Sequence, residues 1–564
     1  MTSVGATLLA AKRSRRVPEL FHDLAARAER SAASRPLVMV AFTLLYLIPT
    51  VQLARLKLFW DDEFYTLYLA LTPDWKTLLQ AMATGADQSP PSLFYLAHFI
   101  LRIFGTGHVT LRLAAMIGFW VLCVCLYEIM RPLTSPAWAV VAMLFPLTTN
   151  FYYYATEARG YGPVLGFAAL AMLSWLRATA NYRRSIYVPL LAFSLAAAVG
   201  GHYYATLVAV CLGLGELVRT VSRRKIDWPI CAALLFTGVP LLVFFQIIQK
   251  AKGYSSHFWA VPAWSDAISF YPTELGTGLI ALLGALGLAL GFGVYLGGRE
   301  GLRGSQARAP LNAWQLTAIV SLSALPLLVM VLAKFVTHGF TDRYTISALV
   351  GVTILLCYFL FRAAPQPRAA LVAALICVGV FGLKVLMFRA EFSDQRTALA
   401  SDIRILSRTG DRAIAILGST RFHRLSFYAP RQIATRLNYV ADASSSLRYM
   451  GHDTVDRGLL SLNPWFPIKV LPEESFLEDN RDFLVYGNIS SGSWITFDLP
   501  KWGKTTLVER DEKDLLFSVN DVQVTPSASV VAQERAAATR MLYWKTPQTG
   551  PALCTVYMGP AGCP

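Results

Sequence analysis

The sequence predicts a polytopic α-helical membrane protein with about eleven transmembrane helices, juxtamembrane helices on the outer side and a C-terminal soluble α/β domain. Of its 564 residues, 55% are hydrophobic and only 15% are charged, which excludes an ordinary soluble enzyme. The formal net charge is +16, but Lys and Arg cluster in short connections between apolar runs, where they set membrane orientation. We therefore expect no nucleic-acid partner.

The first 35 residues form a basic segment that we expect to be cytoplasmic. Seven Lys and Arg residues precede an apolar run over residues 36–54, about the length that spans a bilayer. No A-x-A-like cleavage site follows this run, which favours an uncleaved first span over a removable signal peptide. The stretch after Arg55 then lies outside.

The later apolar runs were assigned by requiring that cytoplasmic connections be rich in Lys and Arg. The segment Pro90–Phe104 decides the count, because it is short and is interrupted by His98 and Arg102. We interpret it as a helix along the outer membrane surface, and every predicted cytoplasmic connection is then basic. The predicted spans are residues 36–54, 111–130, 136–153, 161–177, 186–201, 204–219, 229–249, 274–297, 313–335, 343–361 and 369–388.

Composition divides the chain into three parts: a cytoplasmic segment 1–35, a transmembrane domain 36–389 with an outer loop 57–110, and an outer domain 390–564. In the outer domain, residues 413–418, 482–487 and 514–519 read as buried strands and 391–408 as a helix. We find no convincing nucleophile and base in it, so we expect it to bind, cover or position an acceptor.

The triplet Asp61-Asp62-Glu63 places three carboxylates just beyond the first predicted span. Carboxylates are costly near hydrocarbon, and such clusters usually line a polar cavity or act on a ligand. A solvated loop tip is the alternative.

The rule that cytoplasmic connections are rich in Lys and Arg places other polar residues on the outer side of the membrane, together with the acidic triplet. Glu157 and Arg159 could pair, orient one another or hold a ligand, and an interfacial ion pair at a helix end is an equal alternative. His202-Tyr203-Tyr204 interrupts an apolar stretch, and its aromatic residues are typical of an interfacial belt.

Cations on this side suit an anionic ligand. Arg343 opens a predicted span against the usual bias of Arg toward the cytoplasm, and its planar fork fits the phosphate of a lipid head group. Pairing with Asp342 or Glu157 is the alternative. Lys250 and Lys252 lie in a long outer loop with two Trp residues, which suit an anionic or sugar-bearing ligand or anchor the loop at the interface.

The sequence shows no nucleotide-binding or zinc motif in a credible context, so nothing supports ATP, NAD or zinc chemistry. Six of the eight cysteines fall inside apolar spans and read as packing residues. Cys554 and Cys563 belong to the outer domain, and we expect them to form a disulfide.

An ordered series of motifs resembles the C-class integral-membrane glycosyltransferases, which include the protein O-mannosyltransferases and the lipid A aminoarabinose transferases. The order and spacing agree over about 390 residues, although Ser89 and Ser92 depart from the usual residues of the second motif. The matching segments are Trp60–Tyr65, with Asp62 and Glu63 in register, Asp87–Tyr95 followed by Arg112-Leu113, Tyr154–Tyr161, His202-Tyr203 and Arg343-Tyr344.

The resemblance implies transfer of a hexosyl or pentosyl group from a polyprenyl-phosphate donor to a hydroxyl of a lipid, glycan or protein. The reaction is expected on the outer face of a bacterial-type cytoplasmic membrane, with inversion at the anomeric carbon. Such a transfer requires a base that accepts the proton of the hydroxyl and cations that stabilise the departing phosphate. No cofactor is required, although a divalent metal at Asp61 and Asp62 is possible.

Each candidate residue then has an expected role. Asp62 is the general base with Asp61 as its substitute, and Glu63 and Glu157 orient the acceptor or hold the partners of Asp62. The remaining residues are Arg159, Arg343, Lys250 and Lys252 for the donor phosphate, and Tyr161, His202, Tyr344 and Asp87 for the substrates.

Two other classes of protein share some of these sequence features. A transporter or flippase of a lipid-linked or anionic substrate would also gather charges around a cavity, but should place them near the midplane and often shows repeated halves. An anchored binding protein explains neither the eleven spans nor Arg343 at the membrane edge.

Overall fold

The structure is a computed structural model that describes residues 23–297, 310–488, 493–511 and 514–522. Cys554 and Cys563 lie outside these residues, as does most of the predicted cytoplasmic segment. The chain forms two compact units that interleave along the sequence. The membrane unit comprises residues 1–57, 89–248 and 260–393, and the sheet unit comprises 58–88, 249–259 and 394–564.

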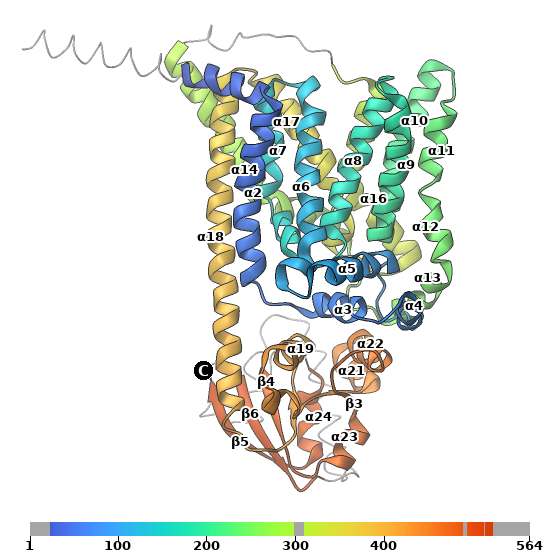
Figure 1. Cartoon of the computed structure of the whole chain (residues 1–564), viewed down its shortest axis with the longest axis vertical. Helices are drawn as coiled ribbons and strands as arrows, with labels where there is room; N and C mark the ends of the chain where they lie inside the picture. Colours follow the sequence, from blue (N-terminus) through green and yellow to red (C-terminus); the bar gives the residue numbers. More distant parts are fainter. Residues whose placement is uncertain (1–22, 298–309, 489–492, 512–513, 523–564) are drawn as a thin grey trace, which may run out of the picture. The chain divides into compact units, whose positions relative to one another are not determined.

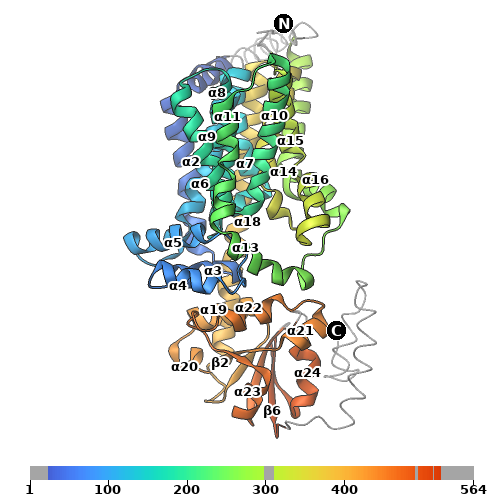
Figure 2. The same cartoon turned by 90° about the vertical axis from the view of Figure 1, so that its right-hand side faces the viewer.

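The membrane unit is a bundle of helices that run side by side (Figures 1 and 2). Each predicted span contains at least one helix. The helices are α2 (Arg35–Leu56), α6 (His108–Leu133), α7 (Pro136–Thr148), α8 (Tyr161–Thr179), α9 (Arg184–Gly201), α10 (Thr206–Arg223), α11 (Trp228–Leu235), α12 (Gly238–Val243), α13 (Phe245–Ala251), α14 (Trp264–Gly297), α15 (Ala313–Ser323), α16 (Leu325–Leu332), α17 (Ala348–Ala363) and α18 (Pro367–Leu406).

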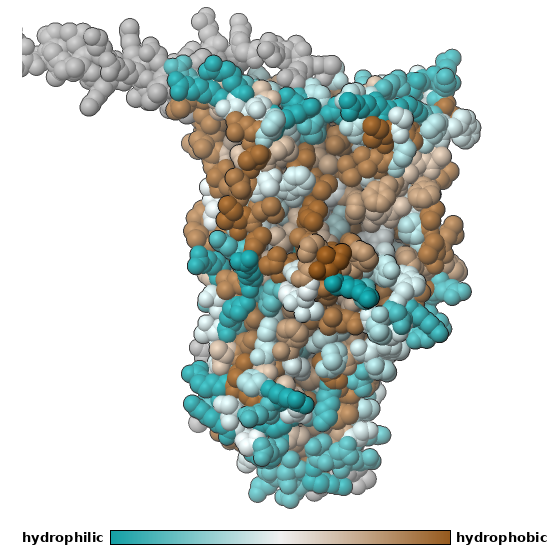
Figure 3. Space-filling model, viewed as in Figure 1, coloured by the Kyte–Doolittle hydropathy of each residue, from teal (hydrophilic) through white to brown (hydrophobic). Residues whose placement is uncertain are grey.

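Within the described residues, six of these helices are long and apolar enough to cross a membrane, or up to eight if each bent pair is one span. The predicted count of eleven is therefore not confirmed. One pair bends by 58° between α15 and α16, where Pro326 in the first turn of α16 removes a backbone donor. The face of the bundle seen in Figure 3 is largely apolar, as expected of an integral membrane protein.

The helix α5 (Pro91–Phe104) lies across the bundle rather than along it (Figures 1 and 2). This direction agrees with the prediction of a surface helix over this segment. Inside the bundle, α6 and α8 approach closely: a Cβ at Gly118 would lie 2.4 Å from the carbonyl oxygen of Gly162. Small residues allow such backbone contact between membrane helices.

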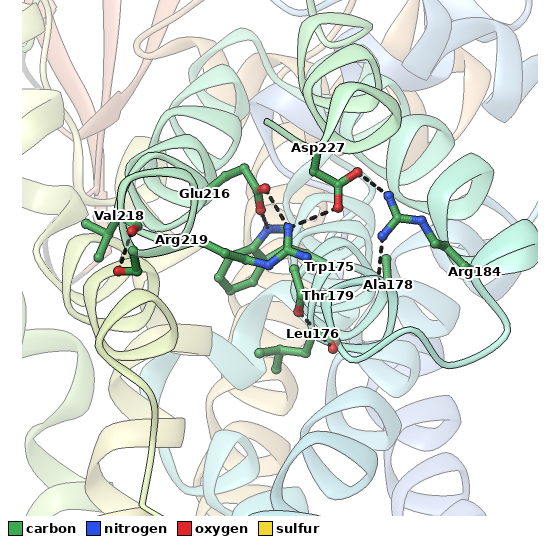
Figure 4. A network of polar contacts seen from close by, with 10 residues as sticks. Trp175, Leu176, Ala178, Thr179, Arg184, Glu216, Val218, Arg219 and Asp227 are labelled. Carbon is green, nitrogen blue, oxygen red and sulfur yellow. Dashed lines mark hydrogen bonds and ion pairs between the residues drawn. The ribbon is translucent and has the colours of Figure 1, made fainter. Parts of the chain in front are cut away.

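A buried ion-pair network joins α8, α9, α10 and α11 (Figure 4). Arg219 Nη1 donates to Glu216 Oε1 at 2.6 Å and to Asp227 Oδ2 at 3.1 Å. Trp175 Nε1 donates to the other oxygen of Glu216, and Arg184 pairs with Asp227. Burial works to raise the pKa of Asp227, but the hydrogen bonds from Arg184 and Arg219 outweigh it and lower the pKa.

The sheet unit contains a six-stranded mixed sheet in the order β3-β2-β1-β4-β6-β5. Strands β3, β2, β1 and β4 are parallel, and β6 runs antiparallel to β4 and β5. The elements are β1 (Ile414–Ile416), β2 (Leu437–Ala441), β3 (Val470–Pro472), β4 (Phe483–Asn488), β5 (Lys504–Asp511), β6 (Asp514–Asn520), α3 (Asp61–Ala70), α4 (Trp75–Met82), α19 (Ser419–Tyr428), α20 (Arg431–Ala434), α21 (Ala443–Met450), α22 (Thr454–Leu462), α23 (Glu473–Asp479) and α24 (Ile495–Trp502).

Both faces of this sheet are buried. Ile414 and Leu484 pack into one core, whereas Ala415 and Val485 pack into another, because successive residues of a strand point to opposite faces. The prediction of an α/β domain is confirmed, with the three predicted strands at β1, β4 and β6. The predicted helix 391–408 is the last part of α18.

Candidate functional site

The first part of the candidate site is a turn in the membrane unit between the short helix η1 (Asn150–Thr156) and α8. Glu157 is 1% exposed and Arg159 is 9% exposed. A Cβ at Gly160 would lie 2.1 Å from the carbonyl oxygen of Gly201. Only glycine permits this approach, which brings the start of α8 against the end of α9.

The approach of α8 and α9 assembles an aromatic cluster, which we define as Tyr161, His202, Tyr204 and Tyr344. The ring centroids of Tyr161 and His202 are 5.8 Å apart, and those of His202 and Tyr344 are 5.0 Å apart. Tyr204 stacks on Tyr344 at 4.6 Å. The Tyr204 hydroxyl also donates to the carbonyl of Gly339 at 3.2 Å, so the cluster joins three separate connections of the bundle.

Two guanidinium groups belong to this region. Arg343 Cζ lies 6.0 Å from the ring centroid of Tyr161, about the limit of a cation–π contact. Arg159 Nη2 donates to Ser89 Oγ at 2.8 Å. The structure thus brings together six predicted residues: Glu157, Arg159, Tyr161, His202, Arg343 and Tyr344.

The two departures from the family pattern have structural roles. Ser89 accepts the hydrogen bond from Arg159, and Ser92 Oγ donates to the carbonyl of Gly200 at 2.6 Å. The second contact lies beside the close approach of Gly160 and Gly201.

The end of α2 is held by two buried cations whose roles the sequence did not indicate. Arg112 Nη1 donates to the carbonyls of Ala54 and Lys57 at 2.6 and 2.9 Å. Lys57 Nζ donates to the carbonyl of Thr156 at 3.1 Å, next to Glu157. These bonds satisfy carbonyls that a helix end leaves without intrahelical donors.

Lys250 and Lys252 are not part of the aromatic cluster. Both belong to the sheet unit, and their side chains are exposed. The predicted loop is helical here, because Lys250 lies in α13 and Lys252 opens the short helix η3 (Lys252–His257). The helix η3 packs within the sheet unit, since Arg457 Cζ lies 3.8 Å from the ring centroid of Tyr254 and Arg457 donates to the carbonyl of Gly253. Asp87 also belongs to the sheet unit and is 5% exposed.

The acidic triplet forms the first turn of α3 in the sheet unit. Carboxylates are favourable there because they face the positive end of the helix dipole. Glu63 is fully buried, whereas Asp61 and Asp62 are partly exposed. Asp61 Oδ2 accepts a short hydrogen bond from Ser419 Oγ, and Asp61 Oδ1 lies 3.7 Å from His423 Nε2.

Other contacts with α19 hold the segment that leads into α3. Arg424 Nε donates to the carbonyl of Phe59 at 2.9 Å, and the amide of Phe59 donates to the Tyr428 hydroxyl at 3.0 Å. The imidazole of His423 stacks on Phe64 with centroids 5.3 Å apart. The residues of α19 carry no motif, so sequence reasoning missed them.

Burial shifts both members of the Asp61 and His423 pair. It raises the pKa of Asp61 to about 6, against the lowering effect of the Ser419 hydrogen bond, and it lowers the pKa of His423 to about 3. At neutral pH Asp61 is mostly ionised and His423 is neutral. Within the described residues, no group of three or more His, Cys, Asp or Glu side chains could hold a metal ion; a divalent ion at Asp61 and Asp62 stays a prediction.

Comparison with known proteins supports the motif resemblance. Residues 88–250 match the family described as dolichyl-phosphate-mannose-protein mannosyltransferase. No curated protein sequence matches the chain.

Solved structures of ArnT are similar in fold to this chain. ArnT from Cupriavidus metallidurans bound to undecaprenyl phosphate has a TM-score of 0.52 at 14% identity, over 85% of this chain and 97% of that chain. The apo state of ArnT has a TM-score of 0.54 at 12% identity over the same shares. The oligosaccharyltransferase AglB from Archaeoglobus fulgidus, in complex with an inhibitory peptide and a dolichol-phosphate, has a TM-score of 0.38 at 12% identity, over 91% of this chain and 77% of that chain.

Proposed function

Because residues 88–250 match the dolichyl-phosphate-mannose-protein mannosyltransferase family and the chain is similar in fold to ArnT, we propose that it transfers a sugar from a polyprenyl-phosphate donor to an acceptor hydroxyl. The acceptor is a lipid, a glycan or a protein. The proposal rests on two guanidinium groups of the membrane unit that lie next to aromatic rings: Arg343 Cζ is 6.0 Å from the ring centroid of Tyr161, and Arg159 Cζ is 6.0 Å from that of Phe94.

The donor phosphate is assigned to these two arginines. A planar guanidinium binds phosphate oxygens through paired hydrogen bonds and stabilises the charge that develops on a departing phosphate. The rings of Tyr161, His202 and Tyr344 offer faces for the apolar side of a sugar. The ArnT structure that contains undecaprenyl phosphate supports a lipid phosphate as the ligand class.

We assign the role of general base to Asp62, which accepts the proton of the acceptor hydroxyl. The hydroxyl oxygen attacks the anomeric carbon, the bond from that carbon to the phosphate oxygen breaks, and the phosphate leaves with the electron pair. This single displacement inverts the anomeric carbon. Asp62 is in register with the family motif and keeps part of its surface exposed, whereas Asp61 accepts a hydrogen bond from Ser419.

We assign three further carboxylates to the orientation of the acceptor. Glu157 lies two residues before Arg159 in the membrane unit, and Glu63 and Asp87 belong to the sheet unit. The distribution of Lys and Arg favours a site on the outer face of a bacterial-type cytoplasmic membrane. A transporter remains the rival, and the family match and fold favour the transferase.

The reaction is tested in a deletion strain that is complemented with wild-type protein, Asp62→Asn or Asp74→Asn. Asp74 caps α4 by accepting from the amide of Thr77 at 2.8 Å, and Asn caps equally well, so this change is a matched control in the same unit. We expect loss of a glycoconjugate in the deletion strain, restored by wild type and Asp74→Asn but reduced about 100-fold or more by Asp62→Asn. If no glycoconjugate changes while solute uptake or export does, the chain is a transporter.

The donor site is tested by binding of undecaprenyl phosphate to purified protein. Arg343→Gln should weaken binding roughly 10- to 100-fold, the contribution of charge-assisted hydrogen bonds. Arg362→Gln is the matched control, because Arg362 is exposed at the other end of α17. Equal binding by both variants would remove Arg343 from the donor site.

A further inference from the structure

The strand order of the sheet unit reverses direction at β1. The chain leaves β1 toward β2 on one side, and β4 later adds to the other side of β1. In open parallel sheets, ligands bind beyond the carboxyl ends of the strands at such a reversal. Here β1 ends at Ile416 and α19 begins at Ser419, so the N-terminus of α19 faces this position.

The chain's own Asp61 occupies this position. Its carboxylate accepts from Ser419 in the first turn of α19, and Thr420 also hydrogen-bonds to it. Helix N-termini bind anions through free amide groups and the helix dipole. Asp61 therefore takes the place of an anionic ligand at this helix N-terminus, where the hydroxyl groups of Ser419 and Thr420 hold it.

His423 provides a second, independent indication of a binding site. Its side chain is fully buried, and neither ring nitrogen has a hydrogen-bond partner among the described residues. A buried polar group without a partner is costly. Its Nε2 points to Asp61 Oδ1 at 3.7 Å, so the imidazole faces the same carboxylate that Ser419 binds.

We propose that the sheet unit is a positioning domain, in which α19 binds Asp61 beside the reversal of strand order and thereby fixes the first turn of α3 and the direction of Asp62. This inference rests on the proposed function of Asp62. Asp61 and Ser419 are then positioning residues, and Asp61 is no substitute base. Arg424 and Tyr428 support the same turn through the backbone of Phe59.

The experiment combines hydrogen exchange of full-length protein in nanodiscs with the complementation assay described above. The variants are Ser419→Ala, which removes the hydroxyl, and Ser419→Thr, which keeps it. We expect Ser419→Ala to speed amide exchange in residues 61–70 roughly tenfold, the effect of one lost hydrogen bond to a charged group, and to lower glycoconjugate about tenfold. Ser419→Thr should restore both.

The outcomes separate this inference from the proposed function. Wild-type exchange in Ser419→Ala would overturn the docking of Asp61. If Ser419→Ala exchanges faster but makes a normal amount of glycoconjugate, Asp61 does not position Asp62. The same conclusion follows if Ser419→Thr shows wild-type exchange but does not restore the glycoconjugate. Asp62→Asn with normal product would instead refute the proposed function, whatever the exchange shows.

Discussion

Two carboxylates in different parts of the chain are both largely enclosed but meet opposite kinds of partner. Asp227, between α10 and α11, faces the guanidinium groups of Arg184 and Arg219, which lower its pKa. Asp61, at the start of α3, faces a hydroxyl and a neutral imidazole, and burial raises its pKa to about 6. The first arrangement neutralises the charge, whereas the second leaves it only partly compensated.

The difference teaches which polar clusters hold the fold and which serve chemistry. A carboxylate paired with cations is a fixed charge that joins helices. A carboxylate whose hydrogen-bond donors are neutral, such as Asp61 with Ser419, keeps more of its negative field. Perturbed carboxylates of the second kind are typical of functional sites.

The largest effect is expected from Arg219→Leu. This change leaves Glu216 and part of the charge of Asp227 buried without a cation, which costs about 3–5 kcal/mol. Arg223→Leu is the matched control, because Arg223 is exposed on the same helix and should change stability by about 0.5 kcal/mol or less. Detergent-induced unfolding of both purified variants measures the difference, and equal stabilities would show that the network does not hold the bundle.

Replacing Asp227 and Asp61 in turn by Asn compares the two carboxylates directly. Asp227→Asn removes the anion from two arginines and should cost about 2 kcal/mol of stability. Asp61→Asn keeps an acceptor for Ser419 and should change stability by less than about 1 kcal/mol. The same unfolding assay compares them, and a larger loss for Asp61→Asn would break the distinction.

An effect that depends on pH should appear in His423→Phe, which keeps an aromatic ring stacked on Phe64. The lowered pKa of His423 stabilises the folded state fully above pH 6.5, and this stabilisation is lost as pH falls toward 3. Asp61, with its raised pKa, acts in the opposite direction between about pH 6 and pH 4. The difference between variant and wild type isolates His423.

To measure this pH effect, full-length protein is unfolded in urea, and the unfolded fraction of the sheet unit is determined from its cleavage by a protease. Relative to wild type, His423→Phe should gain about 2 kcal/mol between pH 7 and pH 5. A constant difference between the two proteins across this range would show that His423 is not buried in its neutral form.

The sequence singled out Tyr161, His202 and Tyr344 because they lie in the motif series, and Tyr204 because it interrupts an apolar stretch, but it did not show that their rings are in contact. Glu157, Arg159 and Arg343 drew attention as charges at predicted membrane edges. The number of spans was harder, since bends such as that at Pro326 divide a run into pieces too short to judge by length.

The contacts of Asp61 could not be predicted from local patterns. Ser419 lies 358 residues away from it, in a polar segment without a motif or a distinctive period. Arg219 was read only as a cytoplasmic charge, because the sequence does not show that it is buried against Glu216 and Asp227. Lys250 and Lys252 were grouped with the donor arginines by loop topology, whereas the structure assigns their loop to the sheet unit.

The most direct test of the account compares Asp61→Asn, Asp62→Asn and Asp74→Asn in the complemented deletion strain, with membrane insertion verified for each. The account predicts glycoconjugate reduced about 100-fold or more by Asp62→Asn, an intermediate loss with Asp61→Asn, and a wild-type amount with Asp74→Asn. A normal amount of glycoconjugate with Asp62→Asn would contradict the central claim that Asp62 is the base of a sugar-transfer reaction.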